Sequence, residues 1–174
     1  MYNTHVVIQP GDILTVCDNN DWGIPTGYLG HSAIAVDERQ LVEAVMEYPN
    51  IQLGLNEKFL RPDRRCAVYR PVHAHWGPAA AGFAYRYYEQ SEHYRKHGMI
   101  RPPFTISPAV PLHDPWTGVY CSKLVWLSYY YGAGYAIYND FGLFTPEDVD
   151  SSLRMDSNFM AVYRHPDFAF HIDT

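Results

Sequence analysis

Cys121 is the side chain in this sequence best suited to covalent catalysis. It lies in the segment 118–126, near the predicted start of a helix that Leu124, Val125 and Leu127 would anchor in the core. Free N–H groups and the positive end of the helix dipole at such a position stabilise a thiolate and lower the pKa of the thiol. The same N–H groups can bind the oxyanion of a tetrahedral intermediate. The alternative is that Cys121 is a small buried hydrophobic residue, as free cysteines often are.

His31 is the candidate general base for that thiol. It follows Gly30 and opens a predicted strand over residues 33–36, whose apolar side chains would fix its backbone. A neutral imidazole can take the thiol proton and give a thiolate–imidazolium pair. The sequence has nine histidines. Most of them are expected at the surface or hydrogen-bonded in the core, so the strand context is what distinguishes His31.

Glu43 is the candidate partner of His31. It interrupts an apolar strand predicted over residues 40–46, the expected hairpin partner of the His31 strand. A carboxylate there is unfavourable unless it is paired. A hydrogen bond from the His31 ring would both pair the carboxylate and orient the imidazole. The alternative is that Glu43 faces solvent on the polar side of an edge strand.

A metal site is a competing hypothesis. His93 and His97 are four residues apart on a predicted helix, a spacing that can bind zinc. His73 and His75 are near them in sequence and His113 is further along the chain. No acid lies within the pair as it does in the zinc protease motif. We therefore expect no functional metal and no other cofactor.

Composition indicates a single globular domain. The 174 residues are 47% hydrophobic and 18% charged, which suits one domain over residues 1–174. The net charge of −6 disfavours nucleic acid as a partner. Three cysteines are too few, and odd in number, for a disulfide framework, so we expect a reducing, cytoplasmic location. We recognise no secretory signal and no apolar run long enough to cross a bilayer, and expect no stable membrane insertion.

The elements that must position these side chains are short strands and a few helices. Strands are predicted at residues 13–16, 33–36, 40–46, 51–55, 66–69 and 159–163. Helices are predicted at residues 78–97 and 119–131, and a third begins at Thr145, Pro146 and the two acids after them. Residues 18–29 and 101–115 are predicted loops, the second a candidate cleft wall. The pattern predicts an α+β fold in which a small, mainly antiparallel sheet packs against the helices.

Four motifs follow one another along the chain. They are Pro-Gly-Asp-Ile-Leu (10–14), Gly-His-Ser-Ala-Ile-Ala-Val (30–36), Leu-Val-Glu-Ala (41–44) and Tyr-Cys-Ser-Lys-Leu-Val-Trp (120–126). This ordered set resembles the circularly permuted branch of the NlpC/p60 superfamily of papain-like cysteine hydrolases, the group of YiiX- and YebB-like proteins. The helix start at Thr145 also resembles that group. The resemblance spans about residues 10–163, and the segments 18–29 and 101–115 depart from its pattern.

The resemblance implies a papain-like fold with Cys121 as nucleophile, His31 as base and Glu43 as orienting acid. Tyr120 also matches a tyrosine that is often found beside the nucleophile in this group. We expect Tyr120, and Ser122 on the other side of Cys121, to bind the oxyanion or the substrate. In this branch the histidine strand precedes the nucleophile helix, which a triad tolerates because geometry defines it.

The implied reaction is hydrolysis of an amide bond through a thioester acyl-enzyme. The implied substrate is a small peptide or another amino-acid-containing molecule, including cell-wall peptide fragments. Permuted relatives such as lecithin retinol acyltransferase act instead on lipid acyl groups. The lack of a recognisable membrane anchor or basic amphipathic helix favours the amide. A module that kept the fold and lost catalysis is a further alternative, against which the complete Cys–His–Glu set weighs.

Overall fold

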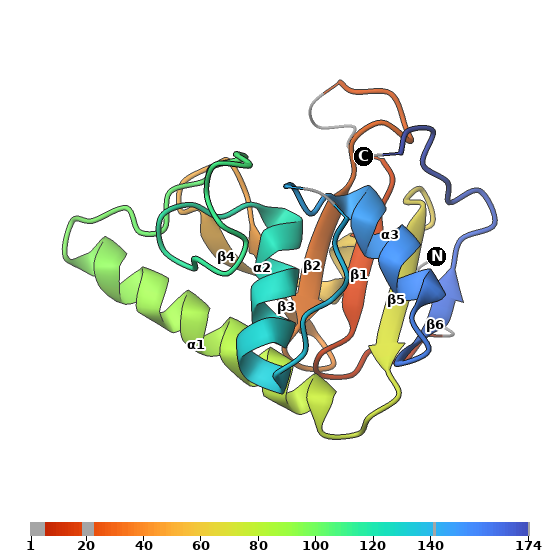
Figure 1. The fold of residues 1–174 in the computed structure, drawn as a ribbon, viewed down its shortest axis with the longest axis horizontal. Helices are drawn as coiled ribbons and strands as arrows, with labels where there is room; N and C mark the ends of the chain where they lie inside the picture. The colour runs from red at the N-terminus through yellow and green to blue at the C-terminus, as the bar shows by residue number, and fades with distance from the viewer. Residues whose placement is uncertain (1–5, 19–22, 141, 174) are drawn as a thin grey trace.

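A six-stranded antiparallel sheet runs through the part of the chain that the computed structural model describes, residues 6–18, 23–140 and 142–173. Its strands are β1 (Ile13–Val16), β2 (His31–Ala35), β3 (Gln40–Ala44), β4 (Ile51–Leu55), β5 (Cys66–Pro71) and β6 (Phe159–Arg164). They lie in the order β4-β3-β2-β1-β5-β6, so β2 and β1 are central (Figure 1). Each neighbouring pair is antiparallel.

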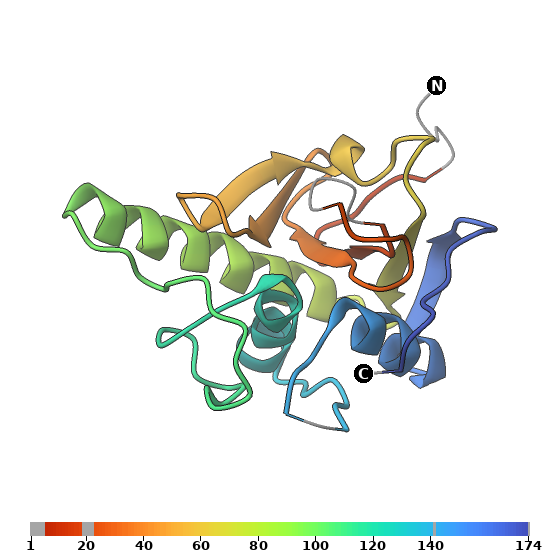
Figure 2. The same ribbon diagram turned by 90° about the horizontal axis from the view of Figure 1, so that it is seen from above.

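Three α-helices pack on this sheet. They are α1 (Trp76–Lys96), α2 (Cys121–Leu127) and α3 (Pro146–Met155), and α2 runs on into a π-helical turn, η3 (Ser128–Ala133). All three contribute to one core cluster, together with Ile13, Ile34 and Val42 of the sheet. Figure 2 shows the helices lying on the same side of the sheet. The predicted α+β class, with an antiparallel sheet packed against helices, is confirmed.

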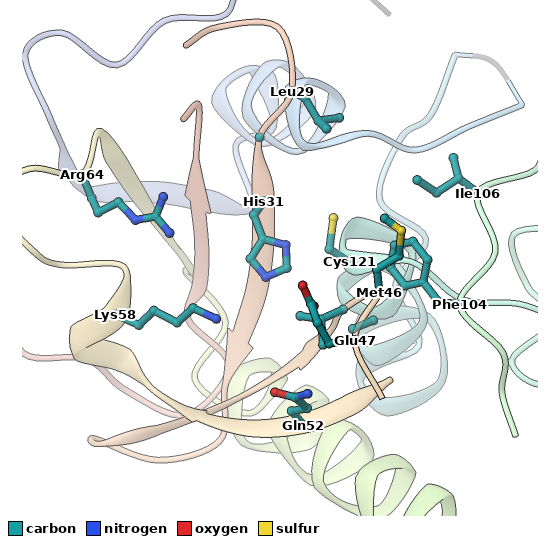
Figure 3. Close-up of a pocket in the computed structure, with 13 residues that line it drawn as sticks. Leu29, His31, Met46, Glu47, Gln52, Lys58, Arg64, Phe104, Ile106 and Cys121 are labelled. Atoms are coloured by element: carbon teal, nitrogen blue, oxygen red, sulfur yellow. The ribbon is translucent and has the colours of Figure 1, made fainter. Parts of the chain in front are cut away.

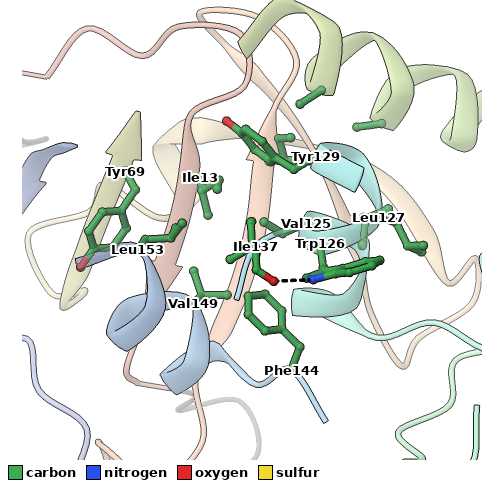
Figure 4. Close-up of a cluster of buried hydrophobic side chains, with 14 of the residues drawn as sticks. Ile13, Tyr69, Val125, Trp126, Leu127, Tyr129, Ile137, Phe144, Val149 and Leu153 are labelled. Atoms are coloured by element: carbon green, nitrogen blue, oxygen red, sulfur yellow. Dashed lines mark hydrogen bonds between the residues drawn. The ribbon is translucent and has the colours of Figure 1, made fainter. Parts of the chain in front are cut away.

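β1 is fully buried because both of its faces are covered. Ile13 packs into the core beneath the helices, which Figure 4 shows. Leu14 and Val16 point to the opposite face and pack with Phe59 and other residues in a second cluster. A strand that is covered on both faces has a nearly continuous run of apolar residues. This run is why the sequence predicts a strand at residues 13–16. The rigid centre of the sheet carries β2, and with it His31.

Several strand boundaries differ from the prediction by one or two residues, and those of β2 and β3 lie nearest the candidate site residues. β2 begins at His31 rather than at residue 33, since His31 already pairs with Val16 at the end of β1. β3 ends at Ala44 rather than at residue 46. The N–H of Val45 donates to the carbonyl of Asn50 at 2.8 Å, which begins the turn into β4.

The helix predicted over residues 119–131 begins two residues later, at Cys121. Val119 is held in extended backbone by a parallel bridge to Phe104, and Tyr120 remains extended with φ −143° and ψ 173°. Cys121 is therefore the first residue of α2. At its other end α2 continues into η3, and this helical segment ends at Gly134. Gly134 has a φ of +70°, a left-handed backbone conformation that glycine adopts without strain.

The positions of α1 and α3 agree with the predictions from the sequence. α1 covers Trp76–Lys96 against a predicted 78–97. α3 begins with the expected capping box: the Thr145 hydroxyl accepts the Asp148 N–H at 3.2 Å, and the Asp148 carboxylate accepts the Thr145 N–H at 2.6 Å. Within the described residues no helix combines the length and apolar character that crossing a bilayer demands.

The two predicted loops have different outcomes. Residues 19–22 of the first lie outside the described residues, and its residues 23–29 contain turns and an isolated bridge at Ile24. The second loop brings Phe104 and Ile106 to the wall of a pocket. Its predicted role as a cleft wall is confirmed.

Candidate active site

Cys121 and His31, 90 positions apart in sequence, meet at one end of the sheet. α2 packs against β2, so the first residue of the helix lies beside the first residue of the strand. The two side chains point toward one another in Figure 3, and the thiol and the imidazole each shift the pKa of the other. Cys121 is partly buried, and the His31 side chain is 16% exposed. The structure therefore brings together the predicted nucleophile and base.

Glu43 lies behind the imidazole, on the neighbouring strand β3. The His31 Nε2–H donates to its Oε2 at 2.6 Å, which leaves Nδ1 of the ring for Cys121 (Figure 3). The Glu43 side chain is only 2% exposed, so the solvent-facing alternative is wrong. Gly54 of β4 makes room for it, because a Cβ there would lie 3.0 Å from the Glu43 Oε1.

Lys58 is a fourth member of this group that the sequence did not reveal. It ends the short 3-10 helix η2 (Asn56–Lys58), and its Nζ donates to the Glu43 Oε1 at 2.9 Å and Oε2 at 3.2 Å. The Lys58 side chain is 43% exposed and lines the same pocket as Cys121. A lysine in a polar segment after a strand has no periodic signal, so only the fold could place it beside Glu43.

The electrostatics favour an ion pair between Cys121 and His31. Burial raises the pKa of the Cys121 thiol, but the interaction with His31 and the backbone N–H of Ser32 hold that pKa below its usual value. Burial lowers the pKa of His31, but the interactions with Cys121 and Glu43 raise it to about 9. The pKa of Glu43 falls to about 2, because the interactions with His31 and then Lys58 outweigh its burial. At neutral pH these directions favour thiolate, imidazolium and carboxylate.

The pocket beside Cys121 is a cavity of about 290 Å³ with two chemically different sides. Leu29, Met46, Phe104 and Ile106 lie on the Cys121 side in Figure 3, whereas Lys58 and Arg64 lie beyond His31. The further lining residues are Gly30, Ala44, Val45, Glu47 and Gln52. The thiol thus faces a space that a small molecule with one apolar part can enter.

Tyr120 and Ser122 are not among the residues that line this pocket, so their role in binding oxyanion or substrate stays a prediction. Both are buried, and both bind Phe144 in the segment before α3. The Tyr120 hydroxyl accepts the Phe144 N–H at 3.0 Å, and the Ser122 hydroxyl donates to the Phe144 carbonyl at 2.5 Å. Their side chains hold the start of α2 in place, and with it the sulfur of Cys121.

The histidines of the metal hypothesis do not form one set of ligands in the described residues. His93 and His97 lie near each other at the end of α1, with ring centroids 4.4 Å apart, and Nδ1 of His97 contacts the His93 carbonyl at 2.8 Å. His73 is hydrogen-bonded through its Nε2 to the Oδ1 of Asn158 at 2.9 Å. Across the described segments, no three His, Cys, Asp or Glu side chains gather as metal ligands would.

Comparisons with known proteins give little beyond this geometry. No family model and no curated protein matches the sequence. A solved structure, that of the metalloprotein yiiX from Escherichia coli O157:H7, aligns over 92% of this chain and 99% of its own. The two sequences are 13% identical and the TM-score is 0.49. At that similarity we carry no property of yiiX over to this chain.

Proposed function

We propose that this protein is a cysteine hydrolase of the peptidase or amidase type, with Cys121 as nucleophile, His31 as general base and acid, and Glu43 as orienting acid. The observation that carries the proposal is the convergence of thiol, imidazole and buried carboxylate at the edge of a pocket. Structural ion pairs also perturb pKa values, but here the titratable pair opens into a space where a substrate can reach the sulfur.

The reaction would proceed in two acyl-transfer steps. The Cys121 thiolate attacks the carbonyl carbon of an amide, and the His31 imidazolium gives its proton to the departing amine as the C–N bond breaks. The neutral imidazole then takes a proton from water, whose oxygen attacks the thioester. Release of the carboxylic acid restores the thiolate–imidazolium pair. The N–H groups at the start of α2, which no described side chain caps, would receive the oxyanion in both steps.

The pocket supports a small substrate. Ligand cavities commonly measure roughly 300–1,000 Å³, so about 290 Å³ is at the lower end of that range and suits a fragment of one or two amino acids. The charged side at Lys58 and Arg64 favours a substrate with polar groups. We therefore favour the amide of a small peptide or other amino-acid-containing molecule, cell-wall peptide fragments included.

A lipid acyl substrate is the second candidate, on one specific observation. Met46 and Ile106, which line the pocket, are 54% and 53% exposed. Exposed apolar side chains at a pocket mouth can guide an acyl chain toward the thiol. The two candidate substrates would use the same triad. They differ in which group of the substrate occupies the apolar side of the pocket, where Leu29 and Ile106 lie.

The permuted NlpC/p60 assignment is part of the proposal. It is supported by the ordered motifs and by the order of elements, with the His31 strand before the Cys121 helix. In the described residues the motif segments 10–14, 30–36 and 41–44 supply neighbouring strands, and 120–126 supplies the helix that packs on them. A fold that lost catalysis would have no need to keep the Glu43–His31 bond aligned with a thiol.

Substrate profiling tests the proposal. The full-length protein would be assayed with fluorogenic dipeptide amides and, in parallel, with short-chain and long-chain acyl esters, using Cys121→Ala as the matched blank. Turnover of the amides that vanishes in Cys121→Ala supports the amidase. Turnover of the long-chain esters alone would replace it by the lipid candidate, and turnover that survives in Cys121→Ala would refute the nucleophile.

A further inference from the structure

The carboxylate of Glu43 has two cationic partners, and only one of them belongs to the proposed triad. His31 Nε2 lies 2.6 Å from Oε2. The Lys58 Nζ lies 2.9 Å from Oε1 and 3.2 Å from the same Oε2. With the carboxylate 2% exposed, these two partners bind it in place of bulk water. One buried negative charge therefore holds two cations when His31 is protonated.

Because the two cations share one carboxylate, the positive charge of Lys58 disfavours the positive charge of protonated His31. Because the Lys58 and His31 nitrogens contact one oxygen, they lie no more than about 6 Å apart, a range in which like charges disfavour each other. The ammonium also withdraws part of the carboxylate's charge from the imidazolium. Both effects make the protonated His31 ring a stronger acid than it would be beside Glu43 alone.

The other groups that face His31 act from different elements. Cys121 of α2 faces the ring in Figure 3 and raises the pKa of His31. Phe59 stacks on it with centroids 5.5 Å apart and carries no charge. Glu47 after β3 and Arg64 before β5 line the same pocket, and Arg64 is paired with Asp18 at 3.1 Å. Among the described residues, Lys58 is the cation that binds the carboxylate of Glu43 in addition to His31 itself.

We propose that Lys58 is a positioning residue that acts through Glu43 and sets the protonation equilibrium of His31. This inference rests on the proposed function for its catalytic meaning. A general acid is most effective when its acidity lies near the working pH, and the pKa of His31 is already raised to about 9. Lys58 keeps the imidazolium from becoming still weaker as an acid, so that it can protonate the leaving amine.

The experiment is an NMR titration of the His31 ring in the Cys121→Ala protein, with and without Lys58→Met. Removing the thiol eliminates the titrating group that is coupled to His31 across the pair. The midpoint of the titration can then be assigned to the His31 ring. We expect Lys58→Met to move that midpoint upward by about half a unit to one unit, a roughly threefold to tenfold decrease in the acid dissociation constant. Lys58→Arg should return it close to the original value, and Lys96→Met, at the exposed end of α1, should leave it unchanged.

A midpoint that stays unchanged or falls in folded Lys58→Met would overturn the inference. If that variant does not fold, Lys58→Gln serves with the same expectation. A purely structural lysine would lower stability without moving the midpoint. The titration needs no turnover, so the two proposals fail separately. An inert Cys121 with a shifted His31 would refute the hydrolase alone, and a reactive Cys121 with an unshifted His31 would refute the role of Lys58 alone.

Discussion

Two buried carboxylates in this molecule each hold a cation and a second hydrogen-bond donor, and they have different consequences. Glu43 binds His31 and Lys58 at one end of the sheet. Asp150 of α3 binds Arg164 of β6 and the Tyr69 hydroxyl of β5 in the packed interior. Burial of the acid is common to both. The chemistry differs because of the partners and what lies next to them.

Neither partner of Asp150 exchanges a proton near neutral pH. Burial and the neighbouring carboxylate raise the pKa of Tyr69 well above its usual value, and an arginine stays protonated in proteins. None of the three side chains lines the Cys121 pocket. In the Glu43 cluster the partner is an imidazole, its other nitrogen faces a thiol, and the thiol faces a cavity. On the proposed function, a titratable partner with access to a pocket distinguishes the Glu43 cluster from a structural ion pair.

The largest effect is expected from Cys121→Ser. Removal of a nucleophile in a triad typically lowers kcat by about 10⁴-fold or more, so turnover of the best amide substrate should fall to the background rate. The free energy of unfolding, from urea denaturation, should change by less than about 1 kcal/mol. Retained turnover in this variant would contradict the role of Cys121 as nucleophile beside the Glu43 cluster.

Replacements of the two partners should differ in size. His31→Ala removes proton transfer, whereas Glu43→Gln removes only orientation and charge, so Glu43→Gln should lower kcat/KM less than His31→Ala does. An intermediate loss of about 10²-fold to 10⁴-fold is expected for Glu43→Gln. Steady-state kinetics of both variants on one substrate gives the ratio, and a reversed order would contradict the assigned roles.

Asp150→Asn sharpens the contrast because it should affect stability without affecting chemistry. It leaves the Arg164 guanidinium, whose side chain is 29% exposed, without its charged partner. Loss of one partner of a largely buried pair lowers the free energy of unfolding by about 2 kcal/mol or more. Urea denaturation should show this loss, while the alkylation rate of Cys121 stays within about twofold. A slowed Cys121 would mean that the two clusters are coupled.

The pH dependence of stability should come from the Glu43 cluster. The pKa of His31 rises from 6.5 to about 9 on folding, so its stabilisation is complete below pH 6.5 and is lost as the pH rises to 9. The pKa of Glu43 falls from 4.5 to about 2, so its stabilisation is complete above pH 4.5 and is lost as the pH falls to 2. Urea unfolding across this range should reveal both slopes. In His31→Ala the alkaline slope should be reduced, and an unchanged slope would assign it to other groups.

Much of the site was predictable because local signals carried it. The apolar run of β1 and the capping box at Thr145 depend on neighbours in sequence, and so does an acid interrupting an apolar strand at Glu43. Non-local contacts were not predictable. Lys58 reaches Glu43 only through the pairing of β3 with β4, and the Tyr120 and Ser122 side chains turn inward because Phe144, more than twenty residues away, binds them. The late start of α2 has the same origin, since Val119 pairs with Phe104.

Alkylation of the three cysteines tests the central claim most directly. Cys17 and Cys66 are fully buried and burial raises the pKa of both thiols, so they serve as internal controls in the native protein. With iodoacetamide near neutral pH and peptide mass spectrometry, Cys121 should react at least about 10²-fold faster than either. The midpoint of its rate against pH should lie below that of a free thiol, and His31→Ala should slow the reaction and raise the midpoint. Equal rates at the three cysteines, or a Cys121 indifferent to His31→Ala, would contradict a thiolate–imidazolium pair.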